Sequence, residues 1–319
     1  MSKCIFLIGL LFLLPSFVFA QQHNLTFTPH WLPQAQFAGY YMAEKKGFYE
    51  AENLHVTITH PSASVMATDK LQTGESDIIS LFLVSAVTAQ DNGIDMVNIC
   101  QLSQQSALLF ITKKTSNIHD ISDLDGKKIG IWESGFDEVP KTAIRKNNCN
   151  VEWVPILSTP NLFLVDGIDA MTVMWYNEYD QIINSGINED ELNPIFLSDY
   201  GFNIPEDGIY CLRSTYNNRK EDLEKFVAAT IKGWQYAEQN REETLEYVLK
   251  IMKAAHVPTN RAHQSWMLDK ILELQQPGEK KNEFGELAED DFIKTQNLLL
   301  EGKYIKNKIP FDHFYKPLN

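Results

Sequence analysis

Strands that alternate with helices are the feature that most constrains the fold of this 319-residue chain. Short apolar or alternating runs such as residues 25–28 are followed by segments with helical spacing, and a second block of the same kind begins at the turn 124–128. A strand predicted at 208–212 returns to the first block, so the chain crosses between the blocks near Ser106 and near Pro205. Two blocks with two crossings predict an α/β protein of two lobes, joined by a hinge that lets them close over a ligand.

The remainder of the chain is predicted to be helical from about residue 221 to about residue 302, with a break at Pro277 and Gly278. Charge runs on these helices are typical of a face exposed to solvent, and we expect the helices to pack outside the first lobe. The predicted division of the chain is a leader at 1–20, a first lobe at 21–105 plus 206–319, and a second lobe at 106–205.

The first residues of the chain have the pattern of a secretory signal peptide. Lys3 supplies a positive charge, the run 5–19 is mostly apolar, and fairly small residues precede Gln21. We therefore predict cleavage between Ala20 and Gln21 and a periplasmic mature protein. The apolar run is too short for a membrane span. A lipid anchor would need a cysteine just after this run, whereas Cys4 precedes it.

Charge and cysteine usage exclude several classes of function. The formal net charge is −14, and loss of Lys3 with the leader makes it −15, which argues against nucleic acid or an anionic membrane surface as a partner. The mature cysteines, Cys100, Cys149 and Cys211, form no disulfide framework, although one pair stays open. No metal-ligand spacing and no Gly-x-Ser-x-Gly, phosphate-loop or Cys-x-x-Cys motif is present. We expect no catalytic residue, metal or cofactor, and a monomer that does not insert into the membrane.

The first candidate binding region is the sequence WLPQAQFAGYY at residues 31–41, where the first strand ends and a helix begins. Ligands of open α/β folds collect beyond the carboxyl ends of strands at such places. Aromatic faces there would stack a flat ring and glutamine amides would read its edge, so the candidates are Trp31, Gln34, Gln36 and Tyr40. For Tyr40 and its neighbour Phe37, docking of the helix on the sheet explains the pattern equally well.

A turn with the sequence SAS at residues 62–64 precedes a predicted helix and is the second candidate region. The hydroxyl groups of Ser62 and Ser64, with the free backbone N–H groups of the helix start, would hold an acceptor on the ligand. A plain N-cap role explains the same serines, and both interpretations stay open.

The third candidate region is the loop after the predicted strand at 129–132. Its candidate residues are Trp132, Ser134, Gly135 and Phe136. A loop that leads into a helix N-terminus is a ready anion site. Because Asp137 and Glu138 already complement the dipole of this helix, we expect a neutral or weakly cationic ring in place of an anion.

The fourth candidate region is the sequence WYNEY at residues 175–179, which follows a predicted strand. Its candidates are Trp175, Tyr176, Asn177 and Glu178. Trp175 or Tyr176 would stack the ring, and the Glu178 carboxylate would accept from an exocyclic amine and balance positive charge on an aminopyrimidine. The alternative for Glu178 is a place in the first turn of a helix, where acids are favoured. Asp207, at the second crossing, either lines the cleft or belongs to a turn.

The order of these stretches resembles a known family. The stretches are WLPQAQFAGYY at 31–41, AEKKGFY at 43–49, the SAS turn, DLDGKKIG at 123–130 and DAMTVMWYNEY at 169–179. The chain is similar to the periplasmic solute-binding proteins of ABC importers, and among them to the branch related to the fungal thiamine-pyrimidine synthase. The resemblance runs from about residue 25 to about residue 250. It implies a type II periplasmic binding fold, in which the ligand is clamped between two α/β lobes.

The resemblance also implies a function. We expect a non-enzymatic solute-binding component that delivers a small heteroaromatic ligand, an aminopyrimidine precursor of thiamine, to an ABC permease subunit. Riboflavin is the alternative ligand, because both rings would use the same residue types. A pyrimidine synthase-like enzyme would need the clustered cysteines of the fungal relative, which this sequence lacks. A ligand-sensing partner of a separate receptor is a third interpretation.

Overall fold

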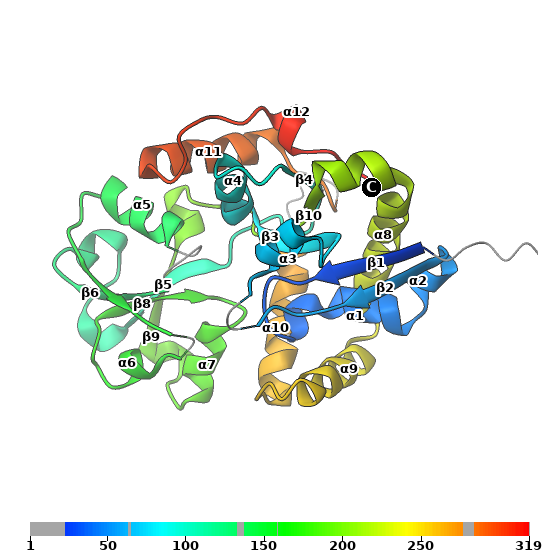
Figure 1. Ribbon diagram of the computed structural model, residues 1–319. Coiled ribbons are helices and arrows are strands. Elements are labelled where there is room, and N and C mark those ends of the chain that lie inside the picture. Colours follow the sequence, from blue (N-terminus) through cyan, green and yellow to red (C-terminus); the bar gives the residue numbers. More distant parts are fainter. Residues whose placement is uncertain (1–22, 63–64, 133–136, 158, 277–283, 319) are drawn as a thin grey trace, which may run out of the picture.

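The computed structural model describes residues 23–62, 65–132, 137–157, 159–276 and 284–318, which form two α/β lobes side by side (Figure 1). The predicted leader and the candidates Ser64, Ser134, Gly135 and Phe136 lie outside the described residues. Each lobe is built on one five-stranded sheet. The prediction of a two-lobed α/β protein is therefore confirmed.

The sheet of the first lobe has the strand order β2-β1-β3-β10-β4. Its strands are β1 (His23–Thr28), β2 (Leu54–Ile58), β3 (Ile78–Phe82), β4 (Met96–Gln101) and β10 (Asp207–Leu212). Strand β1 pairs in parallel with β2 and β3, whereas β10 is antiparallel to both β3 and β4. The second crossing thus brings the chain back into the middle of the first sheet, and the residues that open β10 lie at the boundary between the lobes.

The sheet of the second lobe repeats this plan with the order β7-β6-β8-β5-β9. Its strands are β5 (Leu108–Lys113), β6 (Lys128–Ile131), β7 (Glu152–Pro155), β8 (Ala170–Met174) and β9 (Leu192–Phe196). Strand β6 is parallel to β7 and β8, and β5 is antiparallel to β8 and β9. The carboxyl end of β8 therefore lies beside the amino end of β5, where the first crossing enters this lobe.

Helices connect and cover the two sheets. The α-helices are α1 (Ala38–Lys45), α2 (Phe48–Ala51), α3 (Ala67–Thr73), α4 (Leu83–Asp91), α5 (Glu138–Lys146), α6 (Asn161–Leu164), α7 (Glu178–Asn184), α8 (Arg213–Gln239), α9 (Arg241–Ala254), α10 (Arg261–Gln275), α11 (Glu289–Gly302) and α12 (Phe311–Phe314). Short 3₁₀ helices are η1 (Ala35–Phe37), η2 (Lys114–Ser116), η3 (Ile121–Leu124), η4 (Glu189–Glu191) and η5 (Leu197–Tyr200). No helix in the described part of the chain combines the length and the apolar character needed to cross a membrane.

Helix α8 begins well before residue 221, where the sequence pattern predicts it. Its first turns are largely polar, and the backbone at Arg219 leaves helical geometry with a φ of −134°. The Arg219 guanidinium donates to Asp77 and to the carbonyl oxygen of Asn24. Polar contacts with the sheet hold this part of the helix, and it has no apolar stripe. The spacing of apolar residues therefore does not predict the first turns of α8.

Helix α8 lies directly against α1 because two glycines remove side chains from the contact. A Cβ atom on Gly233 would lie 2.1 Å from the carbonyl oxygen of Gly39, and a Cβ atom on Gly39 would lie 2.2 Å from the Trp234 ring. Neither position accepts a methyl group unless a helix moves. This contact sets the place of α1, and with it the loop between β1 and α1, against the first sheet.

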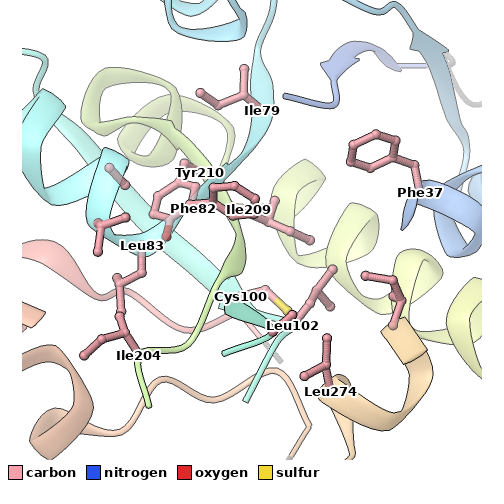
Figure 2. Packing of buried hydrophobic residues seen from close by; sticks show 14 of the residues in the cluster. Phe37, Ile79, Phe82, Leu83, Cys100, Leu102, Ile204, Ile209, Tyr210 and Leu274 are labelled. Atoms are coloured by element: carbon pink, nitrogen blue, oxygen red, sulfur yellow. The ribbon is translucent and has the colours of Figure 1, made fainter. Parts of the chain in front are cut away.

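The apolar core continues from the first lobe into the second. One buried cluster contains Phe82 and Ile209 of the first sheet, Ile204 of the second crossing, and Met174 and Tyr176 of the second lobe. Figure 2 shows Phe82, Ile204 and Ile209 within this cluster. The apolar core is therefore continuous through the crossings, and a hydrogen bond from Gln36 to Tyr176 shows that the lobes are closed on each other.

Two of the C-terminal helices touch both lobes. Helix α10 packs on α9 and η1 of the first lobe and on α7 of the second, and α11 packs on α4 and on α5. Figure 1 shows α10 near the boundary between the lobes and α11 above them. The sequence predicts that all these helices pack on the first lobe. Helices α10 and α11 do so, and they also contact the second lobe.

Replacing Gly233 by alanine should destabilise the protein, because the new methyl group collides with the backbone of α1. Overpacking of this kind costs about 1–3 kcal/mol of the free energy of unfolding, which urea denaturation measures. Lys232→Ala, at the exposed neighbouring position of α8, is the matched control. An unchanged denaturation midpoint in Gly233→Ala would contradict the close approach of the two helices.

Candidate ligand-binding site

The two crossings are held together by hydrogen bonds to buried side chains. Glu206 Oε1 accepts from the backbone N–H of Ala107 at 2.7 Å and from the Ser106 hydroxyl at 3.1 Å. The Gln101 side-chain amide donates to the carbonyl oxygens of Glu206 and Asp207 at 3.2 and 3.0 Å. These bonds place the Glu206 and Asp207 side chains at the boundary between the lobes.

Three separate parts of the chain meet at Asp207. The Gln36 amide nitrogen donates to Asp207 Oδ2 at 2.9 Å and to the Tyr176 hydroxyl of the second lobe at 3.3 Å. The Gln36 amide oxygen in turn accepts from Gln34 at 2.6 Å. Four of the predicted site residues, Gln34, Gln36, Tyr176 and Asp207, are thus brought together across the boundary. They come from the first and fourth of the predicted regions and from the second crossing.

His30 also belongs to this group, and the sequence analysis missed it. Its backbone N–H donates to the Ser80 hydroxyl at 3.1 Å, so the hydroxyl proton is available for Nδ1 of the same histidine at 2.9 Å. The other ring nitrogen, Nε2, lies 3.4 Å from the Gln36 amide nitrogen and 3.6 Å from Asp207 Oδ1. We call His30, Gln36, Tyr176 and Asp207 the Asp207 junction. The signal for His30 was its position directly before the 31–41 stretch.

The second oxygen of Asp207 is unpaired. Asp207 Oδ1 is buried without a hydrogen-bond partner, since the contact with His30 is too long for one. A buried acceptor left in this state costs about 1–3 kcal/mol, and a donor supplied by a ligand would recover that free energy. The closed lobes therefore hold an acceptor aligned beside donors from both sides.

Glu178 is buried in its own loop. Its carboxylate oxygens accept from the backbone N–H of Met174 at 3.1 Å and from the Asn177 amide at 2.6 Å. The carboxylate thus closes the turn between β8 and α7, which carries Tyr176 toward the first lobe. Charges on Glu206, Asp207 and Glu178 add to burial in raising the pKa of the Tyr176 hydroxyl, so all three carboxyls surround this tyrosine.

Three other candidates of the first lobe contact residues outside the Asp207 junction. Trp31 is 37% exposed, and its carbonyl oxygen accepts from His60 at 2.6 Å. Ser62 is exposed and pairs with Val65 through the backbone. Tyr40 is buried with its ring 4.3 Å from that of Phe27, while its hydroxyl has no hydrogen-bond partner. The ring of Tyr40 therefore docks α1 on the sheet.

The remaining candidates belong to the second lobe. Trp132 is half-buried against both apolar clusters of the core. Trp175 is half-buried with its ring edge-on to Phe196, and the Lys270 ammonium lies 3.8 Å from the centre of the same ring. Asn177 bonds to Glu178 and to His263. A lysine already covers the Trp175 ring, which makes Tyr176 the better placed of the two aromatic residues to meet a ligand.

Helix α10 holds the lobes together at this boundary. His263 lies 2.7 Å from Asp180 of α7, and the Trp266 ring N–H donates to the carbonyl oxygen of Trp175 at 2.8 Å. Gln264, which follows His263, accepts from the backbone N–H of Ala35 in the first lobe at 2.7 Å. Adjacent residues of one helix therefore bond to opposite lobes. No motif in the sequence marks these residues, because their partners lie far away along the chain.

Burial between the lobes raises the pKa of four carboxyl groups. The values are about 7 for Glu138, Glu178 and Asp207 and about 8 for Glu206. Loss of hydration is the main cause in each case. Burial lowers the pKa of His30 to about 3 and that of His60 to about 4, so both rings are neutral near pH 7. Among the described residues, none of these four carboxyl groups forms an ion pair with a lysine or an arginine.

The fold defines the class of protein. The aliphatic sulphonate-binding protein SsuA from Escherichia coli superposes with a TM-score of 0.70 and 14% identity over 91% of both chains. The alkanesulfonate-binding protein SsuA from Xanthomonas axonopodis superposes with a TM-score of 0.68 and 13% identity, over 93% of this chain and 99% of that one. The chain thus has the periplasmic binding protein fold of two lobes, as the sequence predicts.

Sequence comparison gives the family. The model of the family described as NMT1/THI5 like matches residues 34–244, and the chain belongs to this family. This range contains the loop and strand residues of the Asp207 junction except His30, and it ends within α9. The resemblance to relatives of the fungal thiamine-pyrimidine synthase is therefore confirmed.

Individual relatives are distant. A Haemophilus influenzae protein named as a thiamine biosynthesis protein is 26% identical over 61% of this chain and 62% of its own length. The riboflavin-binding protein RibY of Chloroflexus aurantiacus is 23% identical over 73% of this chain and 68% of that one. The formylaminopyrimidine-binding protein of Halalkalibacterium halodurans is 24% identical over 76% and 75%. The match thus spans about three fifths of the Haemophilus protein.

The raised pKa values of the four carboxyl groups predict that the free energy of unfolding falls as pH rises from 6.5 to 8. In this window the unfolded chain has already released the carboxyl protons, whose ordinary pKa is near 4.5 for glutamate, whereas the folded protein still holds them and loses them as pH rises. Glu206→Gln should reduce this dependence, most strongly near pH 8. Urea denaturation at several pH values measures it.

The matched control for this experiment is Glu224→Gln, the same chemical change at an exposed position of α8. It should leave the pH dependence unchanged. His30 and His60 act in the opposite direction at the low end of this window, because their ordinary pKa is 6.5 and the unfolded chain still protonates them in part. This contribution is the same in the wild type and in both variants, so it cancels in the comparison. A Glu206→Gln protein with the slope of the wild type would show that Glu206 titrates normally.

Proposed function

We propose that this protein is the exported solute-binding component of an ABC importer and that it clamps a small aminopyrimidine between its lobes. The observation that carries the proposal is the Asp207 junction. There, an unpaired carboxylate oxygen lies beside an amide from the first lobe and a hydroxyl from the second. A ligand that bonds to these groups bonds to both lobes at once, which favours the closed state.

An aminopyrimidine suits these groups because one edge of its ring presents an amine donor next to a ring-nitrogen acceptor. In the proposed complex, Asp207 Oδ1 accepts from the exocyclic amine and the Gln36 amide donates to the ring nitrogen. Tyr176 covers the ring from the second lobe. Entry of the ligand replaces the 3.3 Å contact between Gln36 and Tyr176, which is longer than the 2.9 Å hydrogen bond from Gln36 to Asp207. The relative named for formylaminopyrimidine binding supports this ligand class.

Binding without chemical conversion is supported by the cysteines. The described cysteines are Cys100 and Cys211, buried on neighbouring strands of the first sheet, and Cys149, half-buried in the second lobe. They are not clustered as the enzyme alternative requires. The predicted leader at 1–20 supports a periplasmic location, and the family resemblance supports an ABC permease subunit as the partner.

The ligand is identified by mass spectrometry of small molecules released from the purified protein, together with a thermal-shift screen of aminopyrimidines, thiamine and riboflavin. A tight ligand raises the melting temperature by mass action. An aminopyrimidine that raises it supports the proposal. Riboflavin alone as the hit would overturn the ligand and keep the binding role, in line with the relative named RibY.

Asp207→Asn should weaken binding of an aminopyrimidine by about 2–3 kcal/mol, because an amide nitrogen would face the amine donor where an acceptor is needed. Isothermal titration calorimetry measures the change in Kd. Asp199→Asn, at an exposed position of η5, is the control and should bind as the wild type does. Full affinity in Asp207→Asn would remove Asp207 from the site.

Glu178→Ala should weaken the same ligand by a similar amount, about 2–3 kcal/mol. The substitution also leaves the Met174 N–H and the Asn177 amide without their acceptor, so the melting temperature of the ligand-free protein should fall. A fall in affinity with an unchanged melting temperature would indicate that Glu178 contacts the ligand and does not hold the loop.

A further inference from the structure

A small cavity lies next to the crossings, and the Asp207 junction does not use it. It is lined from the first lobe by Phe82, from the crossings by Ser106, Ile204 and Glu206, and from the second lobe by Glu138 and Met174. Its volume is about 30 Å³, and most of its lining is apolar. Space of this size holds about one or two water molecules, and therefore an amino group but no ring.

Glu138 is the unexplained group in this cavity. Its side chain is 95% buried, since only 5% is exposed, and its Oε2 atom has no hydrogen-bond partner. The lysine one turn along α5 does not compensate, because Lys141 pairs with Asp137 at 2.6 Å. A buried carboxyl oxygen without a partner needs a donor from elsewhere.

Glu206 supplies a second acceptor to the same cavity. Its two hydrogen bonds from described residues, those of Ala107 and Ser106, both use Oε1. Glu206 also lines the cavity, and neither of these bonds uses its Oε2 atom. A cation between Glu138 and Glu206 would allow both carboxyls to ionise, since an opposite charge nearby favours the charged form.

The geometry favours an organic cation over a metal ion. Among the described residues, no group of three or more His, Cys, Asp or Glu side chains has the arrangement of a metal site. A primary ammonium group needs less, because its three N–H donors can be shared among two carboxyls and a hydroxyl. The apolar walls, among them Phe82 and Met174, would pack against the methylene that carries it.

We propose that this cavity, the carboxyl pocket of Ser106, Glu138 and Glu206, receives a primary ammonium group at the end of a short arm on the ligand. The inference rests on the proposed function, in which the ring itself binds at the Asp207 junction. The charge of Asp207 acts on Glu206, and the charges of both act on Tyr176, so the carboxyl pocket and the Asp207 junction are neighbours and ring and arm would bind next to each other. The pocket selects ligands with a charged amine over those with a neutral substituent of the same size.

Two probes with the same ring test this selection: 4-amino-5-(aminomethyl)-2-methylpyrimidine and its 5-hydroxymethyl counterpart. Calorimetry at pH 7 should give the wild type at least tenfold higher affinity for the aminomethyl probe. Glu138→Gln should reduce this preference by tenfold or more, mainly through loss of affinity for the aminomethyl probe. Glu224→Gln on the exposed face of α8 is the matched control and should keep the full preference.

The outcomes separate this inference from the proposed function. Equal affinity of the wild type for both probes, or a preference that survives Glu138→Gln, overturns the carboxyl pocket while the binding function stands. Failure of both probes to bind overturns the proposed ligand class and the pocket with it. Circular dichroism checks the fold of the variant, and if Glu138→Gln does not fold, the comparison of the two probes on the wild type decides.

Discussion

The hydrogen bond from Gln36 to Asp207 is the interaction on which the arrangement between the lobes depends. It joins the loop after β1 to the residue that opens β10, and the same amide nitrogen reaches Tyr176 in the second lobe. The close contact of α1 and α8 through Gly39 and Gly233 sets the position of that loop. The crossing that carries Asp207 is held by Gln101. A polar group shared by three segments can occupy this place only when the lobes are closed.

Much of the fold follows from local pattern, because strands and helices leave their spacing in the sequence. The site was only partly predictable. Gln36 and Tyr176 stand out as polar or aromatic residues at the ends of strands, whereas Ser80 lies within the apolar run of β3 and looks like a core residue. Its contact with His30 depends on the neighbouring positions of β1 and β3 in the sheet, which no short stretch of sequence records. Long-range pairing of this kind also hid His263 and Trp266.

The two acidic residues at the start of α5 have different surroundings, which their residue type alone does not predict. Asp137 and Glu138 were both predicted to complement the helix dipole, and the absence of an anion site was inferred from the pair. The structure separates their roles: Asp137 forms an ion pair with Lys141 near the surface, and Glu138 lies buried at the boundary of the lobes with one unpaired oxygen. Two adjacent acids on a helix point in directions about 100° apart, so a single explanation for both was too coarse.

The contacts of helix α10 with both lobes have a consequence for the residence time of a ligand bound between them. His263 and Gln264 attach neighbouring positions of one helix to opposite lobes, and Trp266 adds a third bond to the second lobe. Opening the lobes must separate α10 from one of them, and so must break its bond to Ala35 or its bonds to Trp175 and Asp180. The free energy of that step enters the barrier to opening whatever the ligand is. Under the proposed function, residues of α10 outside the junction would therefore contribute to residence time, whereas Asp207 would select the ligand. Evolution can thus lengthen or shorten the dwell time of a molecule and leave its identity unchanged.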